Sequence, residues 1–141
     1  MMARPDDVGV GVAIVLTYKD QVLLMRRQGS HASGAWAVPG GWIDRTDAHP
    51  LDVVKREALE EVGITVHDAV LVGVTSEDHA KFRSVTLYYL ATRWEGDPQL
   101  REPQKCSALQ WHPLYEALPV PMFPGLAEGV SFAINHREQG V

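Results

Sequence analysis

The chain has 141 residues, 45% of them hydrophobic and 22% charged, which is enough to bury a substantial core, and we expect a single domain over residues 1–141. A formal net charge of −5 argues against general electrostatic binding to a nucleic acid polymer. The single cysteine, Cys106, excludes an internal disulfide. Because the sequence has neither a membrane-spanning run nor a signal-peptide pattern, we expect a soluble, cytoplasmic protein without membrane contacts.

The first forty residues predict strands followed by a basic loop. Residues 8–18 alternate aliphatic with small side chains, and residues 22–25 form a second apolar run, so a hairpin is expected. Arg26 and Arg27 end this second strand, and a Gly/Ser-rich loop with His31 follows. Guanidinium groups and loop N–H groups can hold phosphates, although composition alone favours an ordinary solvated turn.

The middle of the chain predicts a loop, a helix and a second loop. Gly40 and Gly41 permit a tight turn at which the backbone can approach a ligand closely. The helix is expected over residues 51–62, with Pro50 in its first turn and Gly63 ending it. The candidate N-cap residues are Asp47 and His49.

The acidic residues of the predicted helix share one face. Glu57, Glu60 and Glu61 stand at positions i, i+3 and i+4, and Arg56 can pair with Glu60. The neighbouring apolar stripe consists of Leu51, Val54, Ala58 and Val62. Crowded carboxylates repel one another, and hard cations such as Mg²⁺ bind such oxygens together with substrate phosphates. Taken alone, the acids favour a solvated helix face, whereas the flanking glycines favour a metal site.

The second half of the chain predicts further strands and a terminal helix. Strands are expected at residues 65–75, 85–94 and 108–112, a helical turn at 113–118 and a helix at 125–137. A polar loop is expected at residues 76–81. Its residues Glu77, Asp78 and His79 could add a metal ligand, but solvated loop residues are the simpler interpretation.

Residues 56–64, Arg-Glu-Ala-Leu-Glu-Glu-Val-Gly-Ile, resemble the second half of the Nudix box at every specified position. That box reads glycine, five residues, Glu, seven residues, then Arg-Glu-apolar-any-Glu-Glu-any-Gly-apolar. The first half departs from it, because the position of the first Glu falls on Ala48 and the spacing from Gly41 to Arg56 is one residue too long. Either Asp47 substitutes for that Glu with a one-residue insertion after it, or the acid is absent.

The resemblance implies an α/β fold, a Nudix-type α/β/α sandwich with a mixed β-sheet and a loop-helix-loop catalytic box. It also implies hydrolysis that depends on Mg²⁺ or Mn²⁺. Glu57 and Glu61 are the principal metal ligands that it implies, and Glu57 is also a candidate base. Glu60 would bind directly or through water, and the Gly40 carbonyl would be a further ligand. Arg56 would orient the acids.

The same resemblance extends to the substrate side. A strand ending in Arg-Arg, followed by a loop into Trp-x-x-Pro-Gly-Gly, resembles the family's wall for nucleotide phosphates. Arg27 is therefore a candidate substrate contact, with His31 and the Gly41 backbone as further candidates. The run from Glu102 to Trp111 resembles MutT-like nucleoside triphosphate pyrophosphatases, in which an acid of this loop can approach the metal. Glu102 is thus a candidate fourth carboxylate.

The implied activity is hydrolysis of a nucleoside diphosphate linked to another group, with conversion of a nucleoside triphosphate to the monophosphate and pyrophosphate as the first expectation. One alternative is a pyrophosphatase of ADP-ribose or of nucleotide sugars. The other is a non-catalytic nucleotide-binding module, against which the intact second half of the box argues. The implied partner is a small-molecule nucleotide, and by resemblance a homodimer is possible.

Overall fold

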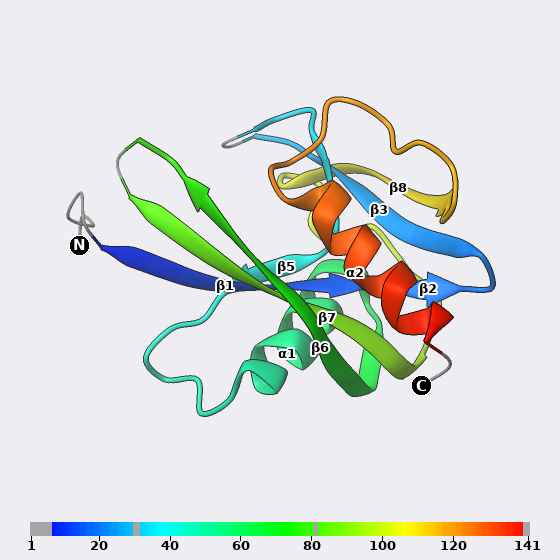
Figure 1. Cartoon of the computed structure of the whole chain (residues 1–141), viewed down its shortest axis with the longest axis horizontal. Helices are drawn as coiled ribbons and strands as arrows, with labels where there is room; N and C mark the ends of the chain where they lie inside the picture. Colours follow the sequence, from blue (N-terminus) through cyan, green and yellow to red (C-terminus); the bar gives the residue numbers. More distant parts are fainter. Residues whose placement is uncertain (1–6, 30–31, 81, 140–141) are drawn as a thin grey trace.

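The structure is a computed structural model that describes residues 7–29, 32–80 and 82–139. The elements in chain order are β1 (Val8–Val15), β2 (Thr17–Tyr18), β3 (Gln21–Arg27), β4 (Trp36–Ala37), β5 (Gly40–Trp42), α1 (Pro50–Val62), β6 (Thr65–Asp78), β7 (Arg83–Glu95), β8 (Cys106–Pro113) and α2 (Leu126–Glu138) (Figure 1). Among the residues described, no helix combines the length and apolar character needed to cross a membrane.

Two sheets form the centre of the molecule. The larger one has the order β5-β1-β7-β6, with β1 and β7 parallel and the two outer strands antiparallel to their neighbours. The smaller, antiparallel sheet contains β2, β3 and β4, with β8 also paired to β3. The predicted mixed sheet is therefore present, and the second sheet beside it is a feature that the sequence pattern did not indicate.

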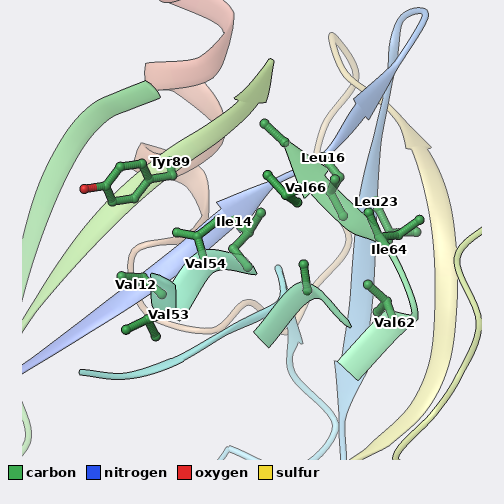
Figure 2. Packing of buried hydrophobic residues seen from close by; sticks show 12 residues of the cluster. Val12, Ile14, Leu16, Leu23, Val53, Val54, Val62, Ile64, Val66 and Tyr89 are labelled. Atoms are coloured by element: carbon green, nitrogen blue, oxygen red, sulfur yellow. The ribbon is translucent and has the colours of Figure 1, made fainter. Parts of the chain in front are cut away.

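Strand β1 lies inside the larger sheet and contributes its two faces to two cores. Val12 and Ile14 pack against the buried face of α1 (Figure 2), whereas Ala13 and Val15 pack against the buried face of α2. Because successive side chains of a strand point to opposite faces, the sheet lies between the two helices. This arrangement confirms the predicted α/β/α sandwich, and Figure 1 shows α1 and α2 on either side of the sheet.

Helix α1 has the boundaries that its sequence predicts. Of the two candidate caps it is His49 that acts, since its Nδ1 accepts a hydrogen bond from the Leu51 N–H at 3.1 Å. Pro50 occupies the first turn, and Gly63 ends the helix in the left-handed conformation with φ 70°. The buried face consists of Val53, Val54, Ala58 and Val62. Burial of each valine stabilises the fold by about 1.5–3 kcal/mol relative to exposure.

Two boundaries differ from the prediction. The prediction of a loop at residues 76–81 is wrong for residues 76–78. There β6 continues as one strand to Asp78 and pairs with β7 through Glu77–Ser84 and Asp78–Arg83. Two of the polar residues in this part of the strand have polar partners across the ladder, since Glu77 faces Ser84 and Asp78 faces Arg83. The helical turn expected at residues 113–118 is not a helix, since β8 runs to Pro113 and a plain turn follows.

Candidate active site

A cleft of about 770 Å³ opens beside the larger sheet and takes side chains from most elements. One end is lined by the β5 glycines and two acids of α1, and the other end by β6, β7 and the start of α2. Among its lining residues are Gly11, Ala13, Arg27, Gln28, Gly40, Gly41, Trp42, Glu57, Glu61, Glu77, His79, Phe82, Ser84, Thr86, Tyr88, Lys105 and Phe123. The cleft is large enough to hold a nucleotide-sized molecule.

The two glycines of β5 bring the acids of α1 to this cleft. Gly40 pairs with Ala13 of β1, and its N–H donates a hydrogen bond to Glu61 Oε2 at 3.0 Å. A Cβ atom on Gly41 would lie 2.4 Å from Glu57 Oε1, so a side chain at this position would displace the carboxylate. The side chains that lie against these two glycines are the Glu61 and Glu57 carboxylates, and the approach of a ligand to the glycine backbone stays a prediction.

Burial dominates the electrostatics of these two acids. It raises the pKa of Glu61 to about 8. The hydrogen bond from the Gly40 N–H lowers this pKa, whereas repulsion from Glu57 and Glu102 raises it further. Burial also raises the pKa of Glu57, and repulsion from Glu60 contributes to that shift. Two desolvated carboxylates that repel each other favour either a bound proton or a bound cation.

The third acid of the helix, Glu60, is exposed and does not line the cleft. The predicted pairing of Arg56 with Glu60 is wrong. Arg56 instead donates two hydrogen bonds to the carboxylate of Asp47, and its Nη2 lies 3.9 Å from Glu57 Oε1. The reason is geometric, because side chains of a helix point back toward its N-terminus, so Arg56 reaches the loop before α1 rather than the turn after it.

Asp47, which stands next to the position of the box's first Glu, is tied into this loop. Its side chain is 4% exposed, and its Oδ2 accepts a hydrogen bond from the Asp44 N–H at 2.8 Å. The Arg56 guanidinium is the largest cause that holds the pKa of Asp47 below its usual range. Of the two sequence alternatives, the geometry favours a substitution by Asp47, because an acid at this loop position does contact the arginine of the box.

Two cationic side chains also line the cleft. Arg27 lies at the end of β3 with its guanidinium 4.5 Å from the Phe123 ring centroid. Burial lowers the pKa of Arg27, and the charge of Glu61 opposes that shift. The Gln28 N–H donates to the Lys105 carbonyl at 2.9 Å, which fixes the loop before β8 beside β3. Arg27 and Lys105 thus face the same cleft as the two acids of α1.

The remaining predicted residues have different positions. Gly41 lines the cleft, whereas His31 lies outside the described residues. Glu102 does not line the cleft but is near it, since its charge contributes to the raised pKa of both Glu57 and Glu61. Its carboxylate lies 3.6 Å from the Lys105 ammonium.

Among the cleft residues that sequence reasoning missed are Trp42, Glu77, His79 and Lys105. Lys105 and Trp42 carry no motif of their own, so the sequence contained no signal for them. Glu77 and His79 were interpreted as solvated loop residues, but both line the cleft. Glu77 is placed there by the continuation of β6 and its pairing with β7. His79 does lie in the loop after β6, where its N–H donates to the Phe82 carbonyl at 2.9 Å. The signal for this longer strand would have been an alternating pattern that continues through residue 78, but residues 76–78 are all polar and therefore resembled a loop.

The acids of the cleft fit a hard divalent cation that also contacts its substrate. Within the described ranges, no three His, Cys, Asp or Glu side chains converge closely enough to hold a metal ion by themselves. Mg²⁺, however, is commonly held by one or two carboxylates and completes its coordination with water and substrate phosphates. Glu57 and Glu61, brought together at β5 and both desolvated, match that donor set.

The chain belongs to the Nudix family, because the NUDIX domain model matches residues 7–131. It is therefore a Nudix hydrolase, in a family that acts on nucleoside diphosphate derivatives. It is 32% identical over 97 residues to an 8-oxo-dGTP diphosphatase of Escherichia coli. The aligned residues cover 67% of this chain and 74% of that protein.

Solved structures agree with this assignment. A MutT Nudix hydrolase from Burkholderia pseudomallei superimposes with a TM-score of 0.79 at 29% identity, covering 89% of this chain and 97% of that one. The NUDIX domain of NrtR from Shewanella oneidensis, solved with ADP ribose, gives a TM-score of 0.75 at 22% identity, with 97% and 90% covered. At that identity the second likeness concerns the fold alone.

Proposed function

We propose that this Nudix hydrolase converts a nucleoside triphosphate to the nucleoside monophosphate and pyrophosphate. The observation that supports it is the juxtaposition of Glu57 and Glu61, held against β5, with Arg27 and Lys105 across one cleft. Acids and cations that line one cleft suit a polyphosphate that arrives with divalent metal. The likeness to an 8-oxo-dGTP diphosphatase supports a triphosphate substrate.

In this proposal Glu57 and Glu61 hold Mg²⁺ or Mn²⁺, with the Gly40 carbonyl as a further ligand. Glu60, on the exposed side of α1, would contribute through water. The bound metal supplies charge neutralisation of the phosphates and a water of lowered pKa. The Gly40 N–H fixes one oxygen of Glu61, so this carboxylate is already oriented before the substrate binds.

The other residues position the substrate and the acids. Arg27 can contact two phosphate oxygens at once through its planar guanidinium, and Lys105 adds a second positive charge on the same wall. Arg56 is a positioning residue, because it lies between the Asp47 carboxylate and Glu57. Glu102 pairs with Lys105 and holds that ammonium near the cleft.

A product assay tests this proposal. The full chain is incubated with Mg²⁺ or Mn²⁺ and with common and oxidised nucleoside triphosphates, ADP-ribose, a nucleotide sugar and a dinucleoside polyphosphate, and the products are separated by chromatography. Monophosphate plus pyrophosphate from a triphosphate is the expected result. Cleavage confined to ADP-ribose or a sugar nucleotide would replace the proposal with the alternative substrate class. Nucleotide binding without any turnover would overturn it in favour of a binding module.

A further inference from the structure

The end of the cleft away from Glu57 contains a third carboxylate that the proposed hydrolysis does not use. Glu77 lines this end from β6, the last strand in the order β5-β1-β7-β6. Adjacent strands lie about 4.8 Å apart and rise about 3.3 Å per residue, so Glu77, which is level with Gly9, lies about 14 Å across the sheet and about 13 Å along it from Gly40, which is level with Ala13. The two backbones are therefore about 19 Å apart. Because side chains reach into the cleft from both ends, the remaining gap is comparable to the length of a nucleoside triphosphate from its outer phosphate to the far edge of its base.

The Glu77 carboxylate is held in place on both sides. Glu77 and Ser84 are direct cross-strand partners, and the Ser84 hydroxyl lies 3.5 Å from Glu77 Oε2 and 2.7 Å from His79 Nε2. The other oxygen, Oε1, faces Gly125 just before α2, where a Cβ atom would lie 2.5 Å away. Gly125 has φ 90°, so a residue with a side chain would be strained as well as crowded. The chain thus leaves space for this carboxylate.

Aromatic rings form a wall of the same cleft. Trp42 is 54% exposed and lies over the glycines of β1, since a Cβ atom on Gly9 would be 2.8 Å from its ring. The Phe82 ring lies 6.0 Å from Trp42 and stacks on the His79 ring at 4.7 Å. Exposed flat rings that line a cleft are the usual surface against which a nucleobase stacks.

We propose that Glu77 reads the nucleobase of the substrate by accepting two neighbouring N–H donors, which selects a guanine-type edge, while the base stacks on the exposed Trp42 ring. A carboxylate is an acceptor only, and its two oxygens suit a pair of parallel donors. Guanine offers N1–H beside its exocyclic amine. Adenine and cytosine place an acceptor beside their amine, and thymine places carbonyls on both sides of its N–H. The inference rests on the proposed function, because it assigns the base end of the same cleft.

Steady-state kinetics with Mg²⁺ on dGTP, dITP and dATP tests the inference. The base of dITP keeps N1–H and lacks the exocyclic amine, so the wild type should prefer dGTP to dITP and dITP to dATP. Glu77→Gln keeps the shape but replaces one acceptor by a donor, and should lower kcat/KM for dGTP by about 10- to 100-fold, mainly through KM. For dATP the change should be less than about threefold. Oxidation at C8 leaves the guanine edge unchanged, so 8-oxo-dGTP should lose as much as dGTP.

Asp78→Asn is the matched control. Asp78 is the next residue of β6, is exposed, and its carboxylate lies 3.9 Å from the Arg83 guanidinium instead of lining the cleft. It should leave the ranking of the three bases unchanged. If Glu77→Gln does not fold, as judged by circular dichroism, Glu77→Asp retains the charge and withdraws it by one methylene, and should also reduce the preference for dGTP over dITP.

Binding of dGMP and dAMP by calorimetry runs in parallel and needs no turnover. Tighter binding of dGMP in the wild type, lost in Glu77→Gln, supports the inference even if the triphosphate activity is absent. An unchanged dGTP preference and unchanged dGMP affinity in Glu77→Gln would overturn it. A wild type that hydrolyses no triphosphate would overturn the proposed function instead, so the two failures are distinguishable.

Discussion

Two consecutive acids of α1, Glu60 and Glu61, have opposite environments. Glu61 is drawn into the cleft by the Gly40 N–H, whereas Glu60 is exposed on α1. Glu61→Gln removes a charge and keeps the shape, so kcat should fall by about 100-fold or more. Glu60→Gln should lower it by less than about tenfold. Turnover numbers and far-UV circular dichroism of both variants check this, and equal losses would contradict the assignment of Glu61 as the principal ligand.

The raised pKa of Glu61 predicts a pH dependence of stability in metal-free protein. In the unfolded chain its pKa returns to 4.5, whereas in the fold it is about 8, so the folded state holds the proton more tightly. The resulting stabilisation is fully present below pH 4.5 and is lost as the pH rises through 8. Glu61→Gln lacks this titration. In EDTA the Tm of Glu61→Gln should therefore rise relative to the Tm of the wild type as the pH increases from 5 to 8.

Thermal unfolding of both proteins at pH 5, 6, 7 and 8 measures that difference, and comparison of the two cancels the contributions of other titrating groups. A constant difference in Tm across this range would contradict the buried, protonated Glu61. Mg²⁺ should restore the wild type most at pH 8, because a cation then replaces the lost proton.

At the scale of the element, the loop before α1 is connected to the helix through Asp47 and Arg56. If Arg56 positions Glu57 through this pair, Asp47→Asn and Arg56→Lys should each lower kcat by about tenfold with little effect on KM. The kcat of the double variant should equal that of the less active single variant, because both changes break the same connection. Multiplied losses in the double variant would show that the two residues act independently.

The same element shows how far the sequence could be interpreted. The box helix, its proline start and its glycine end all depend on neighbouring residues, so local patterns predicted them. The contact of the α1 acids with Gly40 and Gly41 joins distant positions, and no local pattern indicated it. The direction of Arg56 was missed because two carboxylates were within its reach, and helix geometry rather than spacing decided between them. The end of β6 was missed because it depends on pairing with β7.

At the scale of the molecule, the cleft depends on contacts between distant segments. Glu77 and Glu57 belong to the same cleft because β1 and β7 pair in parallel between β5 and β6, and no local pattern specifies that order. The α/β class and the box helix could be predicted from the sequence, whereas the positions of Trp42 and Lys105 on the cleft depend on contacts between distant segments.

Substitutions in the central strand β1 should affect the stability of the fold according to how deeply each residue is buried. Ile14 is fully buried between the sheet and α1, so Ile14→Ala should lower the free energy of unfolding by about 2–5 kcal/mol. Val8, on the same strand, is 54% exposed, and Val8→Ala should change it by less than about 0.5 kcal/mol. Urea denaturation of both variants measures the two values, and similar losses would contradict the position of the core.

The parallel pairing of β1 with β7 also constrains how the chain folds during its synthesis. Residues 8–15 leave the ribosome early, yet their ladder partners are residues 83–90, and α1, which covers one face of β1, is made in between. Until β7 emerges, β1 has β5 as its sheet neighbour and the edge toward β7 stays unpaired. Bringing residues 8–15 together with residues 83–90 costs chain entropy before their contacts form, and this cost slows folding. The nascent chain is thus exposed to aggregation over this interval, and a chaperone would act on this stage.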